Sequence, residues 1–578
     1  MAIPVTPLSP AGLAYARGPV RPPIRPKTSS DDRILGGAMV VLIAALTLAV
    51  ALPLYALLAK SFQSDTGQFV GLKNYITYFS TPAMIASIGN SLKVTLITTA
   101  IAVPLAFLFA YGLTRTCIPF KSLFKGVALI PILMPSLLPA ISLVYLFGNQ
   151  GLAKGLLMGE TIYGPIGIVL GELFFVFPHA LTILLIALST SDARLYEAAE
   201  SLGASKTRIF FTVTLPAARY GLVSAFFVVF TLVITDFGVP KVIGGQYNVL
   251  ATDVYKQVVG RFDFEMGAVV SMVLLAPAIL AFVADRVAER HQAAALTARA
   301  VPYQPAPNRA RDGGFLAFCV LVGMAIGAVL GVAAYASWIK LWPYNLSFTN
   351  YHYQFDLRDG GGWAAYGNSI TMAAWTALAG TAIVFVGAYL VEKTRRFRAA
   401  RTALQFLAMV PMAVPGLVLG LAYIFFFNAP NNPLNFLYHT MPILVINTVA
   451  HFYTVAHLTA VTALKQLDAE FEAVSASLKV PVYKTFWRVT VPVCAPAALD
   501  ISMYLFVNAM TTVSAVVFLY APHTALASIA VLNMDDAGEV ASAAAMGMMI
   551  VYTSAAVRLG HMLLTRGLLA RAPAWRRR

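Results

Sequence analysis

Apolar runs long enough to cross a lipid bilayer recur along almost all of the 578 residues of this chain. A spanning helix needs about 20 apolar residues, and only helices or closed barrels satisfy the backbone inside lipid. The runs are too long and too continuous for barrel strands. The sequence therefore predicts an all-α membrane protein of about 12 transmembrane helices, over residues 34–59, 91–113, 126–147, 164–190, 222–239, 266–283, 314–338, 368–391, 403–427, 441–464, 499–520 and 540–563.

The distribution of positive charge predicts the orientation of these spans. The chain is 59% hydrophobic and 11% charged, with a formal net charge of +16, which in a soluble protein would point to nucleic acid. If both termini are cytoplasmic, 32 of the 41 lysines and arginines lie inside, as the positive-inside rule requires. We therefore expect no nucleic-acid partner, and we expect cytoplasmic segments that include a disordered tail (1–33), a loose linker rich in proline and basic residues (291–313) and a basic tail (567–578).

Two halves of the chain repeat each other at a nearly constant shift of 276 to 280 residues. Gly89-Asn90-Ser91 returns as Gly367-Asn368-Ser369, and the order of the other matches is preserved. Because each unit has six spans, an even number, the units share one membrane orientation. We expect two parallel six-helix repeats, at 34–290 and 314–566, with matches that include Pro131/Pro411, Pro135/Pro415, Asp192/Asp468 and Leu215-Pro216/Val491-Pro492.

The cytoplasmic segment after the fourth span carries the most specific pattern. It runs from Asp192 to Pro216 and is rich in residues that favour helix. Gly203 can adopt the left-handed conformation that ends a helix. We expect a short helix, a sharp turn and a second short helix, with a small surface suited to a partner's groove or, alternatively, only to covering the bundle. The residues that define the segment are Glu197, Ala198, Ala199 and Gly203.

This segment resembles the EAA loop of ABC importer permeases, the family of the maltose, molybdate and methionine permeases. The resemblance covers both repeats and implies that the loop is a coupling helix that inserts into an ATPase subunit. A chain with two such units is similar to the fused permeases for ferric ion, thiamine and 2-aminoethylphosphonate. Asp236-Phe237-Gly238-Val239-Pro240 also resembles that branch and the sulfate and polyamine permeases. The resemblance favours 2-aminoethylphosphonate as the solute, with ferric ion, thiamine, polyamine or sulfate as alternatives.

The matching loop of the second unit departs from the pattern. Aligned on the proline, Lys479 stands where Gly203 stands, Ala473 stands where Glu197 stands, and Glu472 is one place early. We expect a docking helix whose turn has no glycine-only geometry, and the residue that takes the part of Glu197 stays open.

No phosphate-binding loop of the type G-x-x-x-x-G-K-[ST] occurs in the sequence. We therefore expect no catalytic residues and no bound cofactor, with ATP and magnesium handled by two copies of a separate ATPase. The resemblance also implies a periplasmic solute-binding protein and a place in the bacterial inner membrane. Three separated cysteines, Cys117, Cys319 and Cys494, indicate neither a metal site nor a disulfide framework.

Several polar side chains fall within or at the ends of spans, where they are costly unless they face the bundle interior or water. They belong either to a translocation path or gate, or to hydrogen bonds between helices, and the candidates for the path are Glu172, Asp236, Asn447 and His451.

Two other classes of protein share part of this pattern. A secondary transporter also has twelve spans in two units, but it carries a charged signature in the loop between its second and third spans. In this chain that loop is residues 114–125, and it lacks the signature. A membrane enzyme needs a cluster of carboxylates, histidines or a nucleophile, and His451 with His457 is the nearest approach.

Overall fold

The computed structural model describes residues 30–295, 301, 303–394, 396–468 and 470–571, so most of the expected terminal tails lies outside the described residues. The first unit contains α1 (Ser30–Leu46), η1 (Thr47–Ala51), α2 (Leu52–Ser61), α3 (Lys73–Ser80), α4 (Pro82–Arg115), α5 (Lys121–Ala128), η2 (Ile130–Leu133), α6 (Leu137–Phe147), η3 (Lys154–Leu157), α7 (Pro165–Ser189), α8 (Ala193–Ser201), α9 (Lys206–Ile209), η4 (Phe210–Thr214), α10 (Leu215–Thr235), α11 (Gly238–Ile243), α12 (Leu250–Tyr255), η5 (Lys256–Gly260) and α13 (Phe264–Ala295).

The second unit repeats this order after one short antiparallel hairpin. It contains α14 (Arg309–Trp338), β1 (Ile339–Leu341), β2 (Asn345–Phe348), η6 (Tyr351–Tyr353), η7 (Phe355–Leu357), α15 (Gly362–Lys393), α16 (Arg398–Met409), η8 (Val410–Ala413), α17 (Gly416–Phe427), η9 (Asn435–Leu437), α18 (Met441–Lys465), α19 (Glu470–Ser477), α20 (Val482–Thr485), η10 (Phe486–Thr490), α21 (Val491–Val493), α22 (Ala495–Thr511), η11 (Pro522–Thr524), α23 (Ala527–Asp536) and α24 (Val540–Arg571).

The helical membrane fold is confirmed, but three expected spans are not continuous helices. Within the described residues nine helices have the length and apolar composition of a span, and three bent helix pairs bring the number up to 12. The expected third and ninth spans bend by 105° and 114°, and a third pair, 482–493 with 495–511, bends by 75°. Pro135 and Pro415 stand at the first two bends, where a ring that lacks the N–H interrupts the helix.

The repeated Gly-Asn-Ser motif makes the same contacts in both units. Ser91 accepts a hydrogen bond from the backbone N–H of Leu250 at 2.8 Å, and Ser369 accepts one from Ala527 at 2.7 Å. The amide of Asn90 donates to the carbonyl of Asn248, just before α12. The matching amide of Asn368 donates to two carbonyls, at His523 and Ala525, just before α23. The repeat therefore fixes the start of a short helix between the last two spans of each unit.

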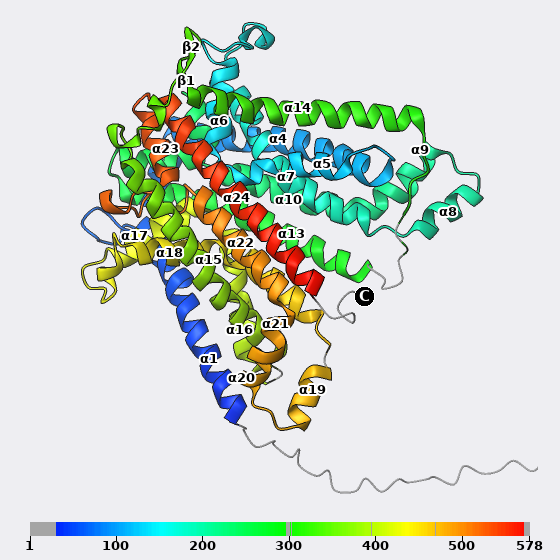
Figure 1. Ribbon diagram of the computed structural model, residues 1–578. Helices are drawn as coiled ribbons and strands as arrows, with labels where there is room; N and C mark the ends of the chain where they lie inside the picture. Colours follow the sequence, from blue (N-terminus) through cyan, green and yellow to red (C-terminus); the bar gives the residue numbers. More distant parts are fainter. Residues whose placement is uncertain (1–29, 296–300, 302, 395, 469, 572–578) are drawn as a thin grey trace, which may run out of the picture.

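The first helix of each unit packs on the other unit. Met39, Leu42 and Leu46 of α1 are buried in the core cluster formed by α15, α16 and α18. Conversely, α14 buries Cys319, Val322, Ile326 and Val329 in the core of the first unit, against α4, α5 and α6. Figure 1 shows α1 lying beside the second bundle and α14 lying along the first. Each spatial bundle therefore contains its own sequence unit without the first helix, together with the first helix of the other unit.

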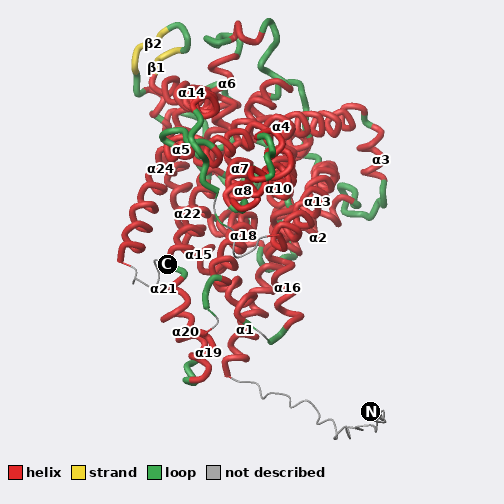
Figure 2. Tube along the Cα trace, turned by 90° about the vertical axis from the view of Figure 1, so that its right-hand side faces the viewer, coloured by secondary structure: helices red, strands yellow, loops and turns green. Residues whose placement is uncertain are grey.

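The two bundles meet near the hairpin and diverge toward α8 and α19 (Figure 1). In the turned view of Figure 2, α8 lies at the front of the molecule and α19 at its lower end, whereas the hairpin lies at the top. A shared core cluster, which includes Leu138 of α6, Leu421 of α17 and Met546 of α24, joins the bundles where they meet. The molecule therefore has one common end and two separate loop ends.

Candidate functional site

The candidate coupling loop of the first unit, named the first coupling loop below, forms the helix α8 and a left-handed turn, as the sequence predicts. The expected second short helix is not separate, because α9, η4 and α10 form one continuous helix, Lys206–Thr235, that runs through Pro216. Asp192 caps α8 by accepting from the N–H of Arg194 at 3.1 Å, and Ser205 caps α9 by accepting from Arg208. Gly203 has φ +71°, and no atom stands within 4 Å of where a Cβ would lie. The turn therefore needs glycine for its backbone conformation and not for lack of space.

Helix α8 has one inner face and one outer face. Tyr196 on the inner face is 4% exposed, and its hydroxyl donates to Thr214 at the start of α10. On the outer face Leu195 is 55% exposed and Leu202, directly after the helix, is 87% exposed. Glu197, Ala198 and Gly203 are also exposed and Ala199 is half-buried, so three of the four residues that define the motif are available to a partner.

The second coupling loop keeps the geometry of the first, although the glycine is missing. Helix α19 ends before Lys479, whose φ is +55°. The expectation that this turn has no glycine-type conformation is wrong, because the lysine itself takes the left-handed conformation that Gly203 takes in the first loop. The apolar residues at matching positions, Phe471, Val474 and Leu478, are exposed here too.

Glu472 takes the place of the inward-facing Tyr196 and not that of Glu197. Its carboxylate pairs with the Nζ of Lys393, at the end of α15, at 2.9 Å. In the first unit the matching cation, Arg115 at the end of α4, lies over the Tyr196 ring at 5.1 Å from its centroid. Ala473 is exposed at the position of Glu197. The second loop therefore presents no acidic side chain where the first presents Glu197.

The candidate path residues of the first unit gather at the bend between α5 and α6. Glu172 of α7 is fully buried and interacts with Asp236, which follows α10. Asp236 accepts a hydrogen bond from the N–H of Val239 at 2.9 Å. Ser136 completes the cluster beside Asp236. The carboxyl groups thus face the bundle interior, as intramembrane charges must.

The candidates of the second unit are less polar and are partly used for packing. Asn447 donates from its buried amide to the carbonyl of Ala515 at 2.6 Å, which favours a hydrogen bond between helices for this residue. His451 packs against Phe452, and its Nδ1 is buried with no hydrogen-bond partner. Thr512 stands where Asp236 stands in the first unit, so the carboxyl pair belongs to one unit alone.

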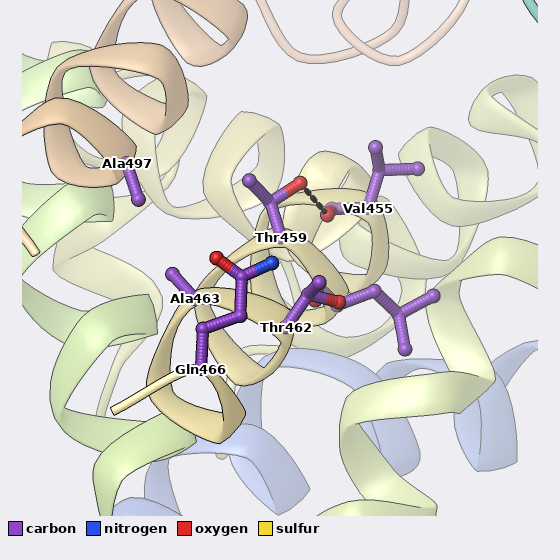
Figure 3. A pocket seen from close by; sticks show the side chains of 7 residues that line it. Val455, Thr459, Thr462, Ala463, Gln466 and Ala497 are labelled. Carbon is purple, nitrogen blue, oxygen red and sulfur yellow. Dashed lines mark hydrogen bonds between the residues drawn. The ribbon is translucent and has the colours of Figure 1, made fainter. Parts of the chain in front are cut away.

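A hollow of about 410 Å³ between α18 and the start of α22 is a feature that sequence reasoning missed. Figure 3 shows Thr459, Thr462 and Gln466 around it, with the Thr459 hydroxyl donating to the carbonyl of Val455. At the matching place in the first unit, a Cβ on Gly221 would lie 2.3 Å from that of Ala187, so α10 lies directly on α7. The second unit has Ala497 and Ala463 there, and the helices stand apart.

The difference between these two helix pairs was visible in the sequence only as a glycine-to-alanine change, which cannot be interpreted until the contact is known.

Within the part of the chain that the structure describes, no three His, Cys, Asp or Glu side chains gather in a way that could hold a metal ion.

The family described as "Binding-protein-dependent transport system inner membrane component" matches residues 102–294 and 383–569, which together make up more than half of the chain. The Ferric transport system permease protein FbpB of Actinobacillus pleuropneumoniae is 26% identical over 548 residues, covering 92% of this chain and 78% of the relative. The Molybdenum transport system permease protein ModB of Escherichia coli K12 is 30% identical over 157 residues, covering 26% and 66%.

A solved bacterial alginate ABC transporter aligns with 45% of this chain and 96% of its own chain, at 14% identity and a TM-score of 0.39, which adds nothing to the assignment. The family match covers both units, and each match includes one coupling loop. The relatives are transport components and not enzymes. The chain therefore belongs to the binding-protein-dependent permease family, and it is a multi-pass membrane permease of an ABC importer with both permease units in one polypeptide.

Proposed function

We propose that this chain forms the complete membrane part of an uptake transporter and that two copies of a separate ATPase dock on α8 and α19. The observation that carries the proposal is the apolar outer face of both coupling loops. Leu195, Ala198 and Leu202 have the spacing of one helical face, and so do the matching residues Phe471, Val474 and Leu478. These residues lie outside the spans, so lipid does not explain their exposure.

The two loops are suited to two copies of one partner because they share a fold. Both have a left-handed turn at the same place, at Gly203 and Lys479. The loops lie at separate ends of the molecule, so each copy can contact its own loop (Figure 1). Each ATPase copy would bring its own ATP and magnesium, and closure of the two copies would draw the loop ends together while the common end opens.

The common end is suited to a soluble solute-binding protein. It carries the hairpin β1–β2 and exposed aromatic side chains, which include Tyr344 and Phe348. Aromatic residues are enriched in protein interfaces. With this end outside and the loops inside, both termini would lie in the cytoplasm and the chain would span a bacterial inner membrane, and the distribution of lysine and arginine supports this orientation.

Two solutes compete in this proposal. The resemblance of the sequence favours 2-aminoethylphosphonate, whereas a relative that aligns with this chain over 78% of its own length is named for ferric transport. Uptake of each solute by vesicles that contain the whole complex, with the solute-binding protein outside, decides between them.

The docking proposal is tested by co-purification and uptake. Leu202→Asp with Leu478→Asp places a charge on each outer face, and we expect the ATPase to be lost from the detergent-solubilised complex. Leu341→Asp, at an exposed position of strand β1 at the other end of the molecule, is the matched control and should retain it. Retention of the ATPase by the double variant contradicts the docking surface. Gradient-driven uptake by the chain alone would overturn the ABC mechanism.

A further inference from the structure

The segment between the two permease units lies against the first coupling helix. Val301 accepts a hydrogen bond from the N–H of Ala193, the first residue of α8, at 2.8 Å. The N–H of Val301 donates in turn to Asp192 Oδ1 at 3.3 Å. Asp192 is the residue that caps α8, so the inter-unit segment joins the cap of the coupling helix. This part of the expected linker is therefore held in place and not loose.

Two residues further on, Tyr303 completes a stack with the inner face of α8. Its ring centroid lies 4.4 Å from that of Tyr196. The Arg115 guanidinium lies over both rings, at 4.7 Å from Tyr303 and 5.1 Å from Tyr196. Arg115 is 4% exposed and donates to the carbonyl of Leu188 at 2.7 Å. Cation–π contacts are strongest when they are desolvated in this way.

The stack ties together four parts of the first unit. Arg115 ends α4, Leu188 belongs to the last turn of α7, Tyr196 belongs to α8, and the Tyr196 hydroxyl reaches Thr214 before α10. Burial raises the pKa of Tyr303, and the nearby Glu200 carboxylate raises it further. The Tyr303 phenol is therefore neutral at physiological pH, and the stack contains one positive charge and no negative one.

Beyond Tyr303 the segment makes hydrogen bonds with the start of α14 and with Cys117. Arg311 donates to the carbonyl of Ala306 at 2.7 Å, and Cys117 contacts the carbonyl of Pro305 through its sulfur at 3.2 Å. Asn308 caps α14 by accepting from the N–H of Arg311. A short ordered path thus runs from the coupling helix to the first helix of the second unit.

The second coupling loop is held differently. Where α8 has the Tyr196 ring, α19 has a carboxylate, Glu472, which pairs with the cation Lys393. The start of α1 also lies against this loop: Asp31 accepts from the N–H of Val482 at 3.2 Å, and Asp32 pairs with Arg396 at 2.7 Å. The segment before α1, which would match the Tyr303 segment, lies outside the described residues, so the contact of Tyr303 is described for the first loop alone.

We propose that Val301 and residues 303–308 are a clamp that sets the orientation of the first coupling helix and links its movement to α14, with Tyr303 and Arg115 as positioning residues. The proposal rests on α8 being an ATPase contact. The clamp lies on the inner face of α8, opposite the outer residues that a partner would touch. Loss of the clamp should therefore leave ATPase binding in place and reduce the transport obtained from each hydrolysed ATP.

The first test uses the full-length chain without its partners and measures hydrogen exchange. Tyr303→Ala should increase the exchange rate of the backbone amides of α8 about tenfold, including the Ala193 amide that bonds to Val301. Tyr303→Phe keeps the ring and should exchange like the wild type. Tyr55→Ala, at an exposed position of α2, is the control. Unchanged exchange in Tyr303→Ala overturns the clamp, whatever the ATPase does.

The second test measures solute uptake and ATP hydrolysis in vesicles that contain the complete complex. Tyr303→Ala should bind the ATPase normally but transport about fivefold less solute per ATP, and Tyr303→Phe should restore the ratio. Tyr303→Leu and Val301→Pro, which removes one of the two backbone contacts, carry the test if the alanine variant does not fold. An unchanged ratio in the variants contradicts the coupling role. A wild type that neither binds an ATPase nor accumulates solute instead contradicts the proposed function.

Discussion

The two coupling loops have the same fold but different means of support. In the first, a left-handed glycine ends α8, and an arginine that lies over two tyrosine rings holds its inner face. In the second, a lysine takes the left-handed conformation, and ion pairs hold α19 and the neighbouring segments. Aromatic packing keeps its strength in salt, whereas ion pairs with a partly exposed partner, such as Glu472, are screened in part. A repeat can therefore preserve a docking geometry while the residues that maintain it change completely.

The largest effect should come from the turn. Gly203→Val places a β-branched residue at φ +71°, at a cost on the order of 1–3 kcal/mol, and should release the ATPase or uncouple hydrolysis from uptake. Lys479→Val should also reduce coupling, because φ is +55° there. The loss should be smaller, since the residue that is replaced already has a side chain in this conformation.

The variant to compare with Lys479→Val is Lys479→Gly. Glycine adopts the left-handed conformation without strain, so this variant should raise the stability of the second loop by about 0.5–1 kcal/mol. The measurement is the thermal unfolding midpoint together with ATPase activity stimulated by the binding protein. A destabilised Lys479→Gly would show that the lysine side chain, and not the backbone, determines this turn.

The next effect concerns the two helix pairs behind the loops. Gly221→Ala would place a Cβ within 2.3 Å of the Cβ of Ala187 and force α10 away from α7, at a cost of about 1–3 kcal/mol. Ala497→Gly, at the matching position, should cost no more than about 1 kcal/mol, the ordinary cost of glycine in a helix. Equal losses of thermal stability would mean that the two pairs are packed alike.

A smaller effect is expected where the units differ in charge. Asp236→Asn keeps an acceptor for the N–H of Val239 but removes the negative charge, and should slow uptake several-fold without loss of the ATPase. Thr512→Val is the matched change in the second unit and should have less effect on uptake. If uptake by Asp236→Asn equals that of the wild type at low and at saturating solute, the carboxylate only caps α11.

The smallest effect should be a difference in salt dependence. Lys393→Ala removes the ion pair with Glu472 and should cost the second loop about 0.5–1 kcal/mol at low ionic strength, less at 1 M salt. Arg115→Ala should cost the first loop a similar amount at both salt concentrations, because its guanidinium is buried over aromatic rings. Hydrogen exchange of α8 and α19 at the two concentrations measures this, and equal salt dependence would contradict the contrast between the loops.

The sequence by itself determined the membrane fold, the repeat and the first coupling loop. Lipid leaves the backbone few alternatives, so long apolar runs identify spans, and Asp192 and Gly203 mark the two ends of α8 through their own local preferences. Pro216 does not end a helix, because it lies inside the continuous helix Lys206–Thr235. It also located Glu172 and Asp236 as residues that must face inward, because charge in lipid is costly.

Other features depend on contacts between residues far apart in the chain, and only the tertiary structure decided them. Hydropathy is the same whether α1 packs on its own unit or on the other, so the exchange of α1 and α14 could not be seen in the sequence. Lysine disfavours the left-handed backbone conformation, so Lys479 adopts it only because the rest of its loop holds it there. Tyr303 looked like part of a loose linker because its partners, Arg115 and Tyr196, lie more than 100 residues earlier and meet it only when the bundle has folded.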